Sequence, residues 1–200
     1  MQNVKSRREL YSEATREALL EEATRLFTER GYAGTSLEDV ATASQVTRGA
    51  VYHHFAGKQA LFEAVLDLTE TRAVARITAA ATPADPWEAA LAALDAFLDQ
   101  CCDPVYARLV WLEGPAALGW HRWRECEEKY AFGLVERFVT DLVDQGYLDG
   151  QAVGSLVRFS FWMLGGAGLA LAEAPDADRP RLREEWRYLI RRTFSGLRVS

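Results

Sequence analysis

The chain has 200 residues, of which 49% are hydrophobic and 26% are charged, and its formal net charge is −6 at pH 7. This length and composition suffice for a buried core in one or two domains. We find no apolar run long enough to span a bilayer and no signal-peptide layout at the charged N-terminus, so we expect a cytoplasmic protein with no membrane partner.

The negative charge is unevenly distributed along the chain. Residues 1–62 carry eight Lys or Arg against eight Asp or Glu, whereas residues 63–200 carry 15 against 21. A neutral N-terminal segment can bind phosphate if its basic groups converge on one face and its acids point away. The basic groups in question are Arg7, Arg8, Arg16, Arg48 and Lys58.

The N-terminal 30 residues divide into an arm and a helix. Residues 1–11 are predicted to form a polar arm, whose Arg7-Arg8 pair either follows a phosphate backbone or is simply solvated. A first helix is expected over about 13–30, and Gly31 ends it. Its core positions are Leu19, Ala23, Leu26 and Phe27.

Residues 35–55 carry the pattern of two short helices joined by a tight turn. Thr35 followed by Glu38 fits a capping box, so a short helix is expected to start at Ser36. Residues 44–46 break its apolar pattern, and Thr47 can cap a second helix. The buried positions of the two helices are Leu37, Val40, Ala41, Val51 and Phe55.

The outer side of the second short helix carries Arg48, Gly49, Tyr52 and His53. Its first turn presents a guanidinium, a bare backbone and the positive end of the helix dipole. In an ordinary helical hairpin, Tyr52 and His53 would be costly on a solvated face and Gly49 would weaken the helix for no gain. The pattern predicts a helix-turn-helix whose second helix enters the major groove of DNA by its N-terminal end.

These segments together resemble the TetR-type (TetR/AcrR) transcriptional regulators. The resemblance rests on the first helix and on the stretches GYAGTSLEDVA (31–41), TRGAVYHHF (47–55) and GKQALFEAVL (57–66). It implies an all-α fold, with a three-helix DNA-binding domain at 1–60 and a helical ligand-binding and dimerisation domain at 61–200. The expected DNA-binding residues are Thr35, Ser36, Thr47, Arg48, Gly49, Tyr52, His53, His54 and Lys58.

Three of these residues, Tyr52, His54 and Lys58, match positions that contact phosphate in the family. For His54, a packed and hydrogen-bonded histidine next to Phe55 is an equally good interpretation. A fourth helix is expected from Lys58 to about Ala80, linking the DNA-binding domain to the rest of the chain. Further helices are predicted over 87–100, from 103 to Gly114-Pro115, and over about 120–145, 150–173 and 181–197.

Aromatic residues are dense between the fourth helix and the last two helices. Each ring alone suits a core, but so many rigid rings are hard to close-pack and together favour a cavity. The rings expected to line it are Phe97, Tyr106, Trp111, Trp120, Trp123, Tyr130, Phe159 and Trp162. The nearest polar groups are His121, Arg108, Glu113 and Arg122, and each could instead be a surface or ion-pair residue. Such a cavity suits a small apolar or aromatic effector.

The last two helices are candidates for a homodimer interface. The first of them is apolar nearly all round, which a monomer surface tolerates poorly, and its small residues permit close helix crossing. The alternative is that both apolar stripes serve the monomer core. The expected interface residues are Phe161, Gly165, Gly168, Leu169, Trp186 and Leu189.

The function predicted is that of a homodimeric, ligand-responsive regulator, expected to be a repressor that a small molecule releases from a palindromic operator. A redox-sensing regulator using Cys101, Cys102 and Cys126 is one alternative, although free buried cysteine commonly behaves as a small hydrophobe. A helical ligand-binding protein that does not read DNA is another. We find no metal-ligand spacing, phosphate loop or catalytic grouping, so neither a cofactor nor enzyme activity is expected.

Overall fold

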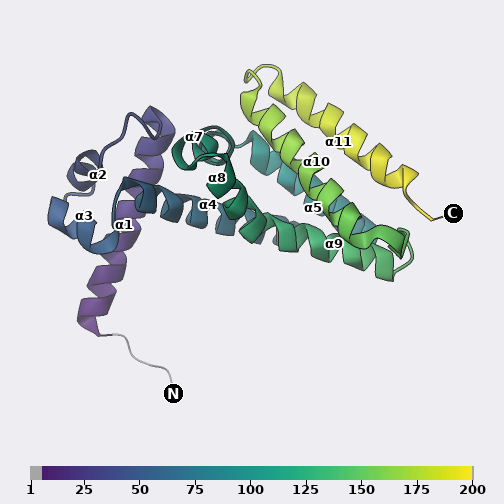
Figure 1. Cartoon of the computed structure of the whole chain (residues 1–200), viewed down its shortest axis with the longest axis horizontal. Coiled ribbons are helices and arrows are strands. Elements are labelled where there is room, and N and C mark those ends of the chain that lie inside the picture. Colours follow the sequence, from purple (N-terminus) through teal and green to yellow (C-terminus); the bar gives the residue numbers. More distant parts are fainter. Residues whose placement is uncertain (1–5, 200) are drawn as a thin grey trace. The chain divides into compact units, whose positions relative to one another are not determined.

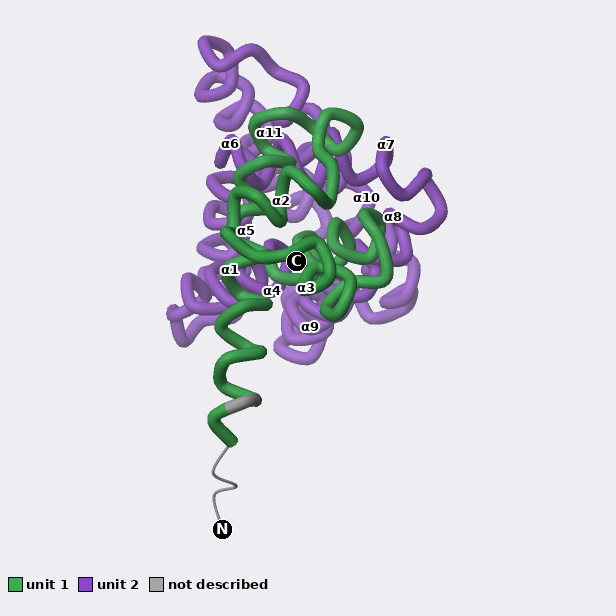
Figure 2. The backbone as a smooth tube through the Cα atoms, turned by 90° about the vertical axis from the view of Figure 1, so that its left-hand side faces the viewer, with its two compact units in different colours: residues 1–68 green, residues 69–200 purple. Residues whose placement is uncertain are grey.

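The computed structural model describes residues 6–199, except for the side chain of Arg8. Within this range every regular element is helical, apart from one β-bridge between Leu148 and Arg198 (Figure 1), which confirms the all-α prediction. The backbone separates into two compact units, of which the first ends at Leu68 and the second begins at Thr69 (Figure 2). The predicted domain boundary after residue 60 stays a prediction, because α4 (Lys58–Ala80) contributes residues to both units.

The first unit contains α1 (Arg7–Arg30), α2 (Leu37–Ala43), α3 (Arg48–His54) and the first half of α4. α1 begins earlier than predicted because Ser6 and Glu9 form a capping box at its start. Residues 7–11 are therefore helical and not part of an arm, while residues 1–5 of the predicted arm lie outside the described residues. Phe27, Tyr32 and Phe62 pack their rings together, with centroids 5.1–5.9 Å apart.

The capping box of α2 differs from the prediction by one residue. Ser36, not Thr35, is the N-cap: its hydroxyl accepts from the Asp39 N–H, and the Asp39 carboxylate accepts from the Ser36 N–H. Thr35 is instead 2% exposed and donates its hydroxyl to the carbonyls of Leu26 and Gly31 at 3.2 and 3.0 Å. Thr35 thus joins the end of α1 to the start of α2 from inside.

The second unit continues from α4 through the remaining helices. They are α5 (Pro86–Cys102), α6 (Pro104–Tyr106), η1 (Ala107–Glu113), α7 (Gly114–Leu118), α8 (Trp120–Glu127), η2 (Glu128–Phe132), α9 (Gly133–Asp144), η3 (Gly150–Ala152), α10 (Val153–Glu173) and α11 (Arg179–Gly196). Two of them, η1 and η2, are π-helical, and η3 is a short 3₁₀ turn. α10 packs against η1, α9, α5 and α11.

The predicted helix end at Gly114-Pro115 is wrong, because α7 carries the chain on to Leu118. Pro115 lies in the first turn of α7, where its missing N–H is tolerated. Gly114 is required for packing: a Cβ there would lie 2.6 Å from Cδ1 of Trp123. The glycine therefore permits a close approach inside a helical stretch and does not end it.

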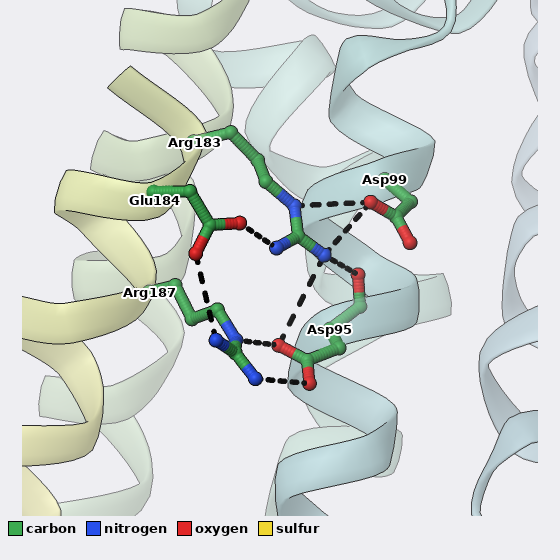
Figure 3. Close-up of polar contacts among 5 residues, drawn as sticks. All are labelled: Asp95, Asp99, Arg183, Glu184 and Arg187. Carbon is green, nitrogen blue, oxygen red and sulfur yellow. Dashed lines mark hydrogen bonds and ion pairs between the residues drawn. The ribbon is translucent and has the colours of Figure 1, made fainter. Parts of the chain in front are cut away.

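Charged side chains hold α11 against α5 (Figure 3). Arg187 donates to both carboxylate oxygens of Asp95 at 2.6 and 3.3 Å, and Arg183 donates to Asp99 at 3.0 Å. Glu184 accepts from both arginines. Bidentate geometry strengthens such pairs, but their partial exposure limits each to about 1 kcal/mol. The network fixes the register between two helices that also enclose the interior of the second unit.

One expectation from composition needs correction. Within the described part of the chain, the helical stretch Gly150–Glu173 is long and apolar enough to span a membrane by length and composition alone. Buried residues of α10 include Val157, Phe161, Ala167 and Leu171. Packing inside the second unit thus accounts for part of the apolar character of α10, while other apolar side chains of the same helix, such as Phe159 and Leu169, are exposed.

Candidate functional site

The exposed face of α3 has the layout that the sequence predicts. The Thr47 hydroxyl caps the helix by accepting from the Ala50 N–H at 3.2 Å, and Val51 faces the core with 0% exposure. Arg48, Gly49, Tyr52 and His53 are all exposed. A Cβ at Gly49 would meet only the Thr47 hydroxyl, at 3.8 Å. No intramolecular packing therefore requires this glycine, and its bare backbone is open to a large partner.

Arg48 is held in place by two neighbours across the short helices. Its Nη1 lies 2.7 Å from Oε1 of Glu38, and its Nη2 donates to the Tyr52 hydroxyl at 3.3 Å. The guanidinium also lies 5.4 Å from the centroid of the Tyr52 ring. More than half of the side-chain surface of both Arg48 and Glu38 is exposed, so an external anion or base edge can compete for this guanidinium.

His54 ends α3, and Lys58 follows at the start of α4. Lys58 is the first residue of α4, and its ammonium lies 4.3 Å from the centroid of the Tyr32 ring, within cation–π distance. His54 is half-buried, and burial, followed by the charges of His53 and Arg16, lowers its pKa below the usual 6.5. His54 is therefore neutral at pH 7 and offers a hydrogen bond but no positive charge.

Two predicted DNA-binding residues serve the fold. Thr35 is buried, so the prediction that it contacts DNA is wrong: the carbonyls at the end of α1 use its hydroxyl. Ser36 is partly exposed, and its hydroxyl donates to the Asp39 carboxylate at 2.6 Å while capping α2. The remaining predicted residues, from Thr47 to Lys58, are exposed or partly exposed.

The second unit contains a partly open cavity of about 150 Å³. Five of the eight predicted rings line it: Phe97, Tyr106, Trp111, Trp123 and Trp162. Other walls come from α4, α9 and α11 through residues such as Ile77, Leu134 and Ile190. A cavity thus lies among five of the predicted rings, and the binding of a ligand there stays a prediction.

Three predicted rings do not line the cavity. Trp120 is 52% exposed and packs on the outer side of Trp123, whose indole N–H is turned inward to the Val110 carbonyl at 2.8 Å. Phe159 is 47% exposed. Tyr130 lies in the π-helix η2, which shifts the phase of side chains relative to an α-helix, and its hydroxyl accepts from Lys129.

The polar groups of the cavity are not those predicted. His121 and Arg122 are exposed, and Arg108 lies 2.7 Å from Glu113 in an ion pair. None of these four is among the lining residues, which instead include the carboxyl groups of Glu70 and Glu127. The sequence carries a signal for Glu70: it lies four residues after buried Leu66 and three before buried Ala73, so an acid interrupts an apolar helical stripe.

The two carboxyl groups are buried together. Glu70 is 2% exposed and Glu127 is 7% exposed, and a hydrogen bond joins them. Burial raises the pKa of Glu70 to about 7, against hydrogen bonds from Tyr106 and Glu127 that lower it. Burial and the charge of Glu70 raise the pKa of Glu127 well above its usual range. At neutral pH the pair therefore shares a proton.

Cys101 lies close to these acids and is fully buried. Burial, with the neighbouring charge of Glu70, raises the pKa of its thiol well above the usual range. The pKa of Cys102 is also raised, again chiefly by burial. Since the thiolate is the form that oxidants attack, the surroundings of both thiols give no support to the redox-sensing alternative.

The residues predicted for a dimer interface fall into two groups. Phe161 is buried, and it lines the cavity together with Gly165. Gly168 is buried under Trp111 of the same chain, whose Cζ2 would lie 2.3 Å from an added Cβ. The prediction that Gly168 makes room for a partner helix is therefore wrong. Leu169 and Leu189 are 38% and 54% exposed, and Trp186 is partly exposed.

Two family models match the chain. The model described as bacterial regulatory proteins of the tetR family matches residues 19–65, which include the helix-turn-helix. The model described as a tetracyclin repressor-like C-terminal domain matches residues 87–197, more than half of the chain. The two matches correspond to the predicted DNA-binding and helical regulatory parts.

Individual relatives agree with these matches. The chain is 27% identical to the transposon Tn10 TetC protein of Escherichia coli over 135 residues, 68% of each chain. It is 46% identical over 74 residues to an HTH-type transcriptional repressor of Mycobacterium tuberculosis, covering 37% of this chain and 39% of the relative.

Among solved structures, a TetR-family transcriptional regulator from Pectobacterium atrosepticum superposes with a TM-score of 0.83 and 28% identity, covering 98% of this chain and 99% of the other. Members of this family are transcriptional regulators that bind operator DNA, dimerise and bind small-molecule effectors. The chain belongs to the TetR family and is a ligand-responsive, DNA-binding transcriptional regulator.

Proposed function

We propose that this regulator is a cytoplasmic homodimeric repressor that leaves a palindromic operator when a small apolar effector occupies the cavity of its second unit. The observation that carries the proposal is the presence of two features on one chain. The first is an α3 face with an exposed guanidinium beside an unobstructed glycine, and the second is a partly open cavity of about 150 Å³. The relative from Mycobacterium tuberculosis is itself described as a repressor.

On the operator, each α3 enters one major groove. Arg48 offers a fork of donors that suits the edge of a guanine, and Gly49 lets the backbone approach closely. Tyr52, His54 and Lys58 contact phosphate and fix the register of α3. Because one such helix makes few base contacts, two-fold symmetry is needed to double them.

The dimer interface uses the exposed apolar side chains of α10 and α11. The large apolar residues exposed there are Phe159, Trp162, Leu169, Tyr188 and Leu189. Contiguous exposed apolar surface marks sites of protein association. Two such helices from each subunit would form a four-helix contact, which keeps Leu169 and Leu189 of the predicted interface and leaves out the buried Phe161 and Gly168.

Release follows from contact between the effector and α4. Glu70, Ala73, Val74 and Ile77 of α4 line the cavity, and the same helix begins at Lys58 in the first unit. An effector that favours a shifted α4 moves the two α3 helices away from the spacing of about 34–36 Å set by one turn of DNA. It acts only to the extent that it binds this state better than the DNA-competent one.

Lys58→Ala is expected to weaken binding to all DNA alike. The ammonium neutralises phosphate and reads no base, so its loss should lower the slope of log affinity against log salt by about one for each α3 helix. Fluorescence anisotropy on operator and random duplexes across a salt series measures this slope. An unchanged slope would remove Lys58 from the phosphate contacts.

A ligand screen tests the effector part of the proposal. Apolar aromatic compounds should quench tryptophan fluorescence, because Trp111 and Trp123 line the cavity, and should dissociate the operator complex. Sugar phosphates and nucleotides should do neither, because the cavity cannot replace the water around several anionic oxygens. Release by polyanions alone, without a response to any apolar compound, would contradict the proposal.

A further inference from the structure

The carboxyl pair of Glu70 and Glu127 is an unusual feature for an apolar cavity. Buried acids normally find a cationic partner or a full set of hydrogen bonds. Here Oε2 of Glu70 accepts a long hydrogen bond of 3.5 Å from Tyr106, while its Oε1 is buried and accepts none. The structure therefore leaves one carboxylate acceptor unused at the wall of the cavity.

Two arginines line the cavity, but neither acts on the pair. Nε of Arg124 is buried without a hydrogen-bond partner and lies 3.9 Å from Glu128, which does not line the cavity, and Arg191 comes from α11. The groups that set the pKa of Glu70 are burial, Tyr106 and Glu127, with no part played by either guanidinium. Within the described residues, the pair thus has no cationic partner.

We propose that the cavity binds a hydrophobic ammonium ion, a compound with one ring and a protonated amine, whose N–H groups donate to Glu70 and Glu127. The inference deepens the proposed function, because it names the chemical class of the effector for the same cavity. The inference rests on the proposed function only in assuming that the ligand bound in the cavity is also the effector that releases DNA.

The size and walls of the cavity fit this class. A cavity of about 150 Å³ is the size that accommodates a single benzene ring. Trp111, Trp123 and Phe161 give it aromatic walls, and such faces attract both rings and cations. An ammonium group provides donors for the unused Oε1, and its charge makes the hydrogen bond to an ionised carboxylate stronger than one from an uncharged donor.

The backbone around the pair also points to a binding site. Glu70 has two hydrogen-bonding neighbours, and each immediately precedes a π-helix. Tyr106 precedes η1, and Glu127 precedes η2. π-helical turns are rare and frequently occur at functional sites. Trp111 of η1 and Ala131 of η2 line the same cavity as the two acids.

The affinity for an ammonium ion should rise with pH. The ion binds the ionised pair, and the pKa of Glu70 is about 7, so binding should strengthen between pH 6 and pH 8. The other titratable groups facing Glu70 are Glu127, Tyr106 and Cys101, and burial raises the pKa of all three well above the usual range. The guanidinium groups of Arg124 and Arg191 also line the cavity, and neither is among the groups that shift the pKa of Glu70.

The test compares three probes of similar size on the full-length protein. 2-Phenylethylamine, 2-phenylethanol and phenylacetate share a ring and carry a cation, a neutral hydroxyl and an anion. Calorimetry and tryptophan fluorescence should show the amine binding at least about tenfold more tightly than the alcohol, and phenylacetate not binding. Equal affinities of amine and alcohol, a preference for the anion, or no binding of any probe at millimolar concentration would overturn the proposal.

Variants then locate the effect. Glu70→Gln should abolish both the preference for the amine and the pH dependence of its binding. The variant should still bind 2-phenylethanol, and this binding shows that its cavity is folded. Glu125→Gln is the matched control, because Glu125 is exposed and pairs with Arg122. An amine preference that survives Glu70→Gln would contradict the proposal. Operator binding is measured separately: an amine that binds selectively without releasing DNA contradicts the proposed function and leaves this inference standing.

Discussion

Gly168→Ala is expected to lower the free energy of unfolding by about 1–3 kcal/mol. The added Cβ would lie 2.3 Å from Cζ2 and 2.5 Å from Cε2 of Trp111. Trp111 is 5% exposed and its ring packs edge-on against Trp123, so it has little room to move. The cost of overpacking, about 1–3 kcal/mol or more, exceeds the gain of about 0.5–1 kcal/mol that alanine normally brings to a helix interior.

Gly165→Ala on the same helix is the control for this prediction. A Cβ at position 165 meets nothing within 4 Å, so this change should leave stability unchanged or raise it by up to about 1 kcal/mol. Urea denaturation followed by circular dichroism measures both variants. If Gly168→Ala were as stable as Gly165→Ala, the close packing of α10 on Trp111 would be wrong.

Arg48→Ala is expected to weaken operator binding by about 1–3 kcal/mol for each α3 helix and to relax the preference at one base position per half-site. The reason is the fork of donors that Arg48 presents at the first turn of α3. In the free protein this guanidinium lies 2.7 Å from a carboxylate oxygen of Glu38. Arg48 must therefore leave Glu38 when it binds the base edge. Affinities for the operator and for variants at each base position measure the effect.

Arg25→Ala provides the comparison. Arg25 is an exposed arginine of the same unit that pairs with Glu22 and Glu29 of its own helix, α1. The Arg25→Ala substitution should leave the affinity for the operator nearly unchanged. Equal losses for Arg48→Ala on operator and on random DNA would make Arg48 a phosphate contact and not a reader of bases.

The helix-turn-helix can be predicted because its signals are local. Thr47 caps α3, and the spacing of Val51 and Phe55 alone defines its buried side. The start of α2 is ambiguous in the sequence, since Thr35 with Glu38 and Ser36 with Asp39 both fit a capping box. A tertiary contact decides between them: the end of α1 needs the Thr35 hydroxyl, which leaves Ser36 as the cap.

The cavity can be predicted only in outline. A high density of aromatic residues indicates a cavity, but whether each ring points into it depends on the side of the helix on which the residue lies. The π-helix η2, which contains Tyr130, shifts side chains around the helix axis relative to an α-helix. The contact between Gly168 and Trp111 joins residues 57 positions apart, and no local pattern announces it. Glu70 is different, because an acid on an apolar stripe is a local signal, although the stripe alone does not identify Glu127 as its partner.

The most direct measurement of the central claim is binding of the full-length protein to the intergenic DNA beside its own gene, compared with a shuffled duplex of equal length. We expect a dimer to bind the intergenic DNA at least about 10³-fold more tightly at physiological salt, with a log–log salt dependence on both duplexes. Addition of a ligand that quenches the cavity tryptophans should dissociate the specific complex. Equal affinity for the two duplexes at every salt concentration would contradict the claim that α3 reads an operator.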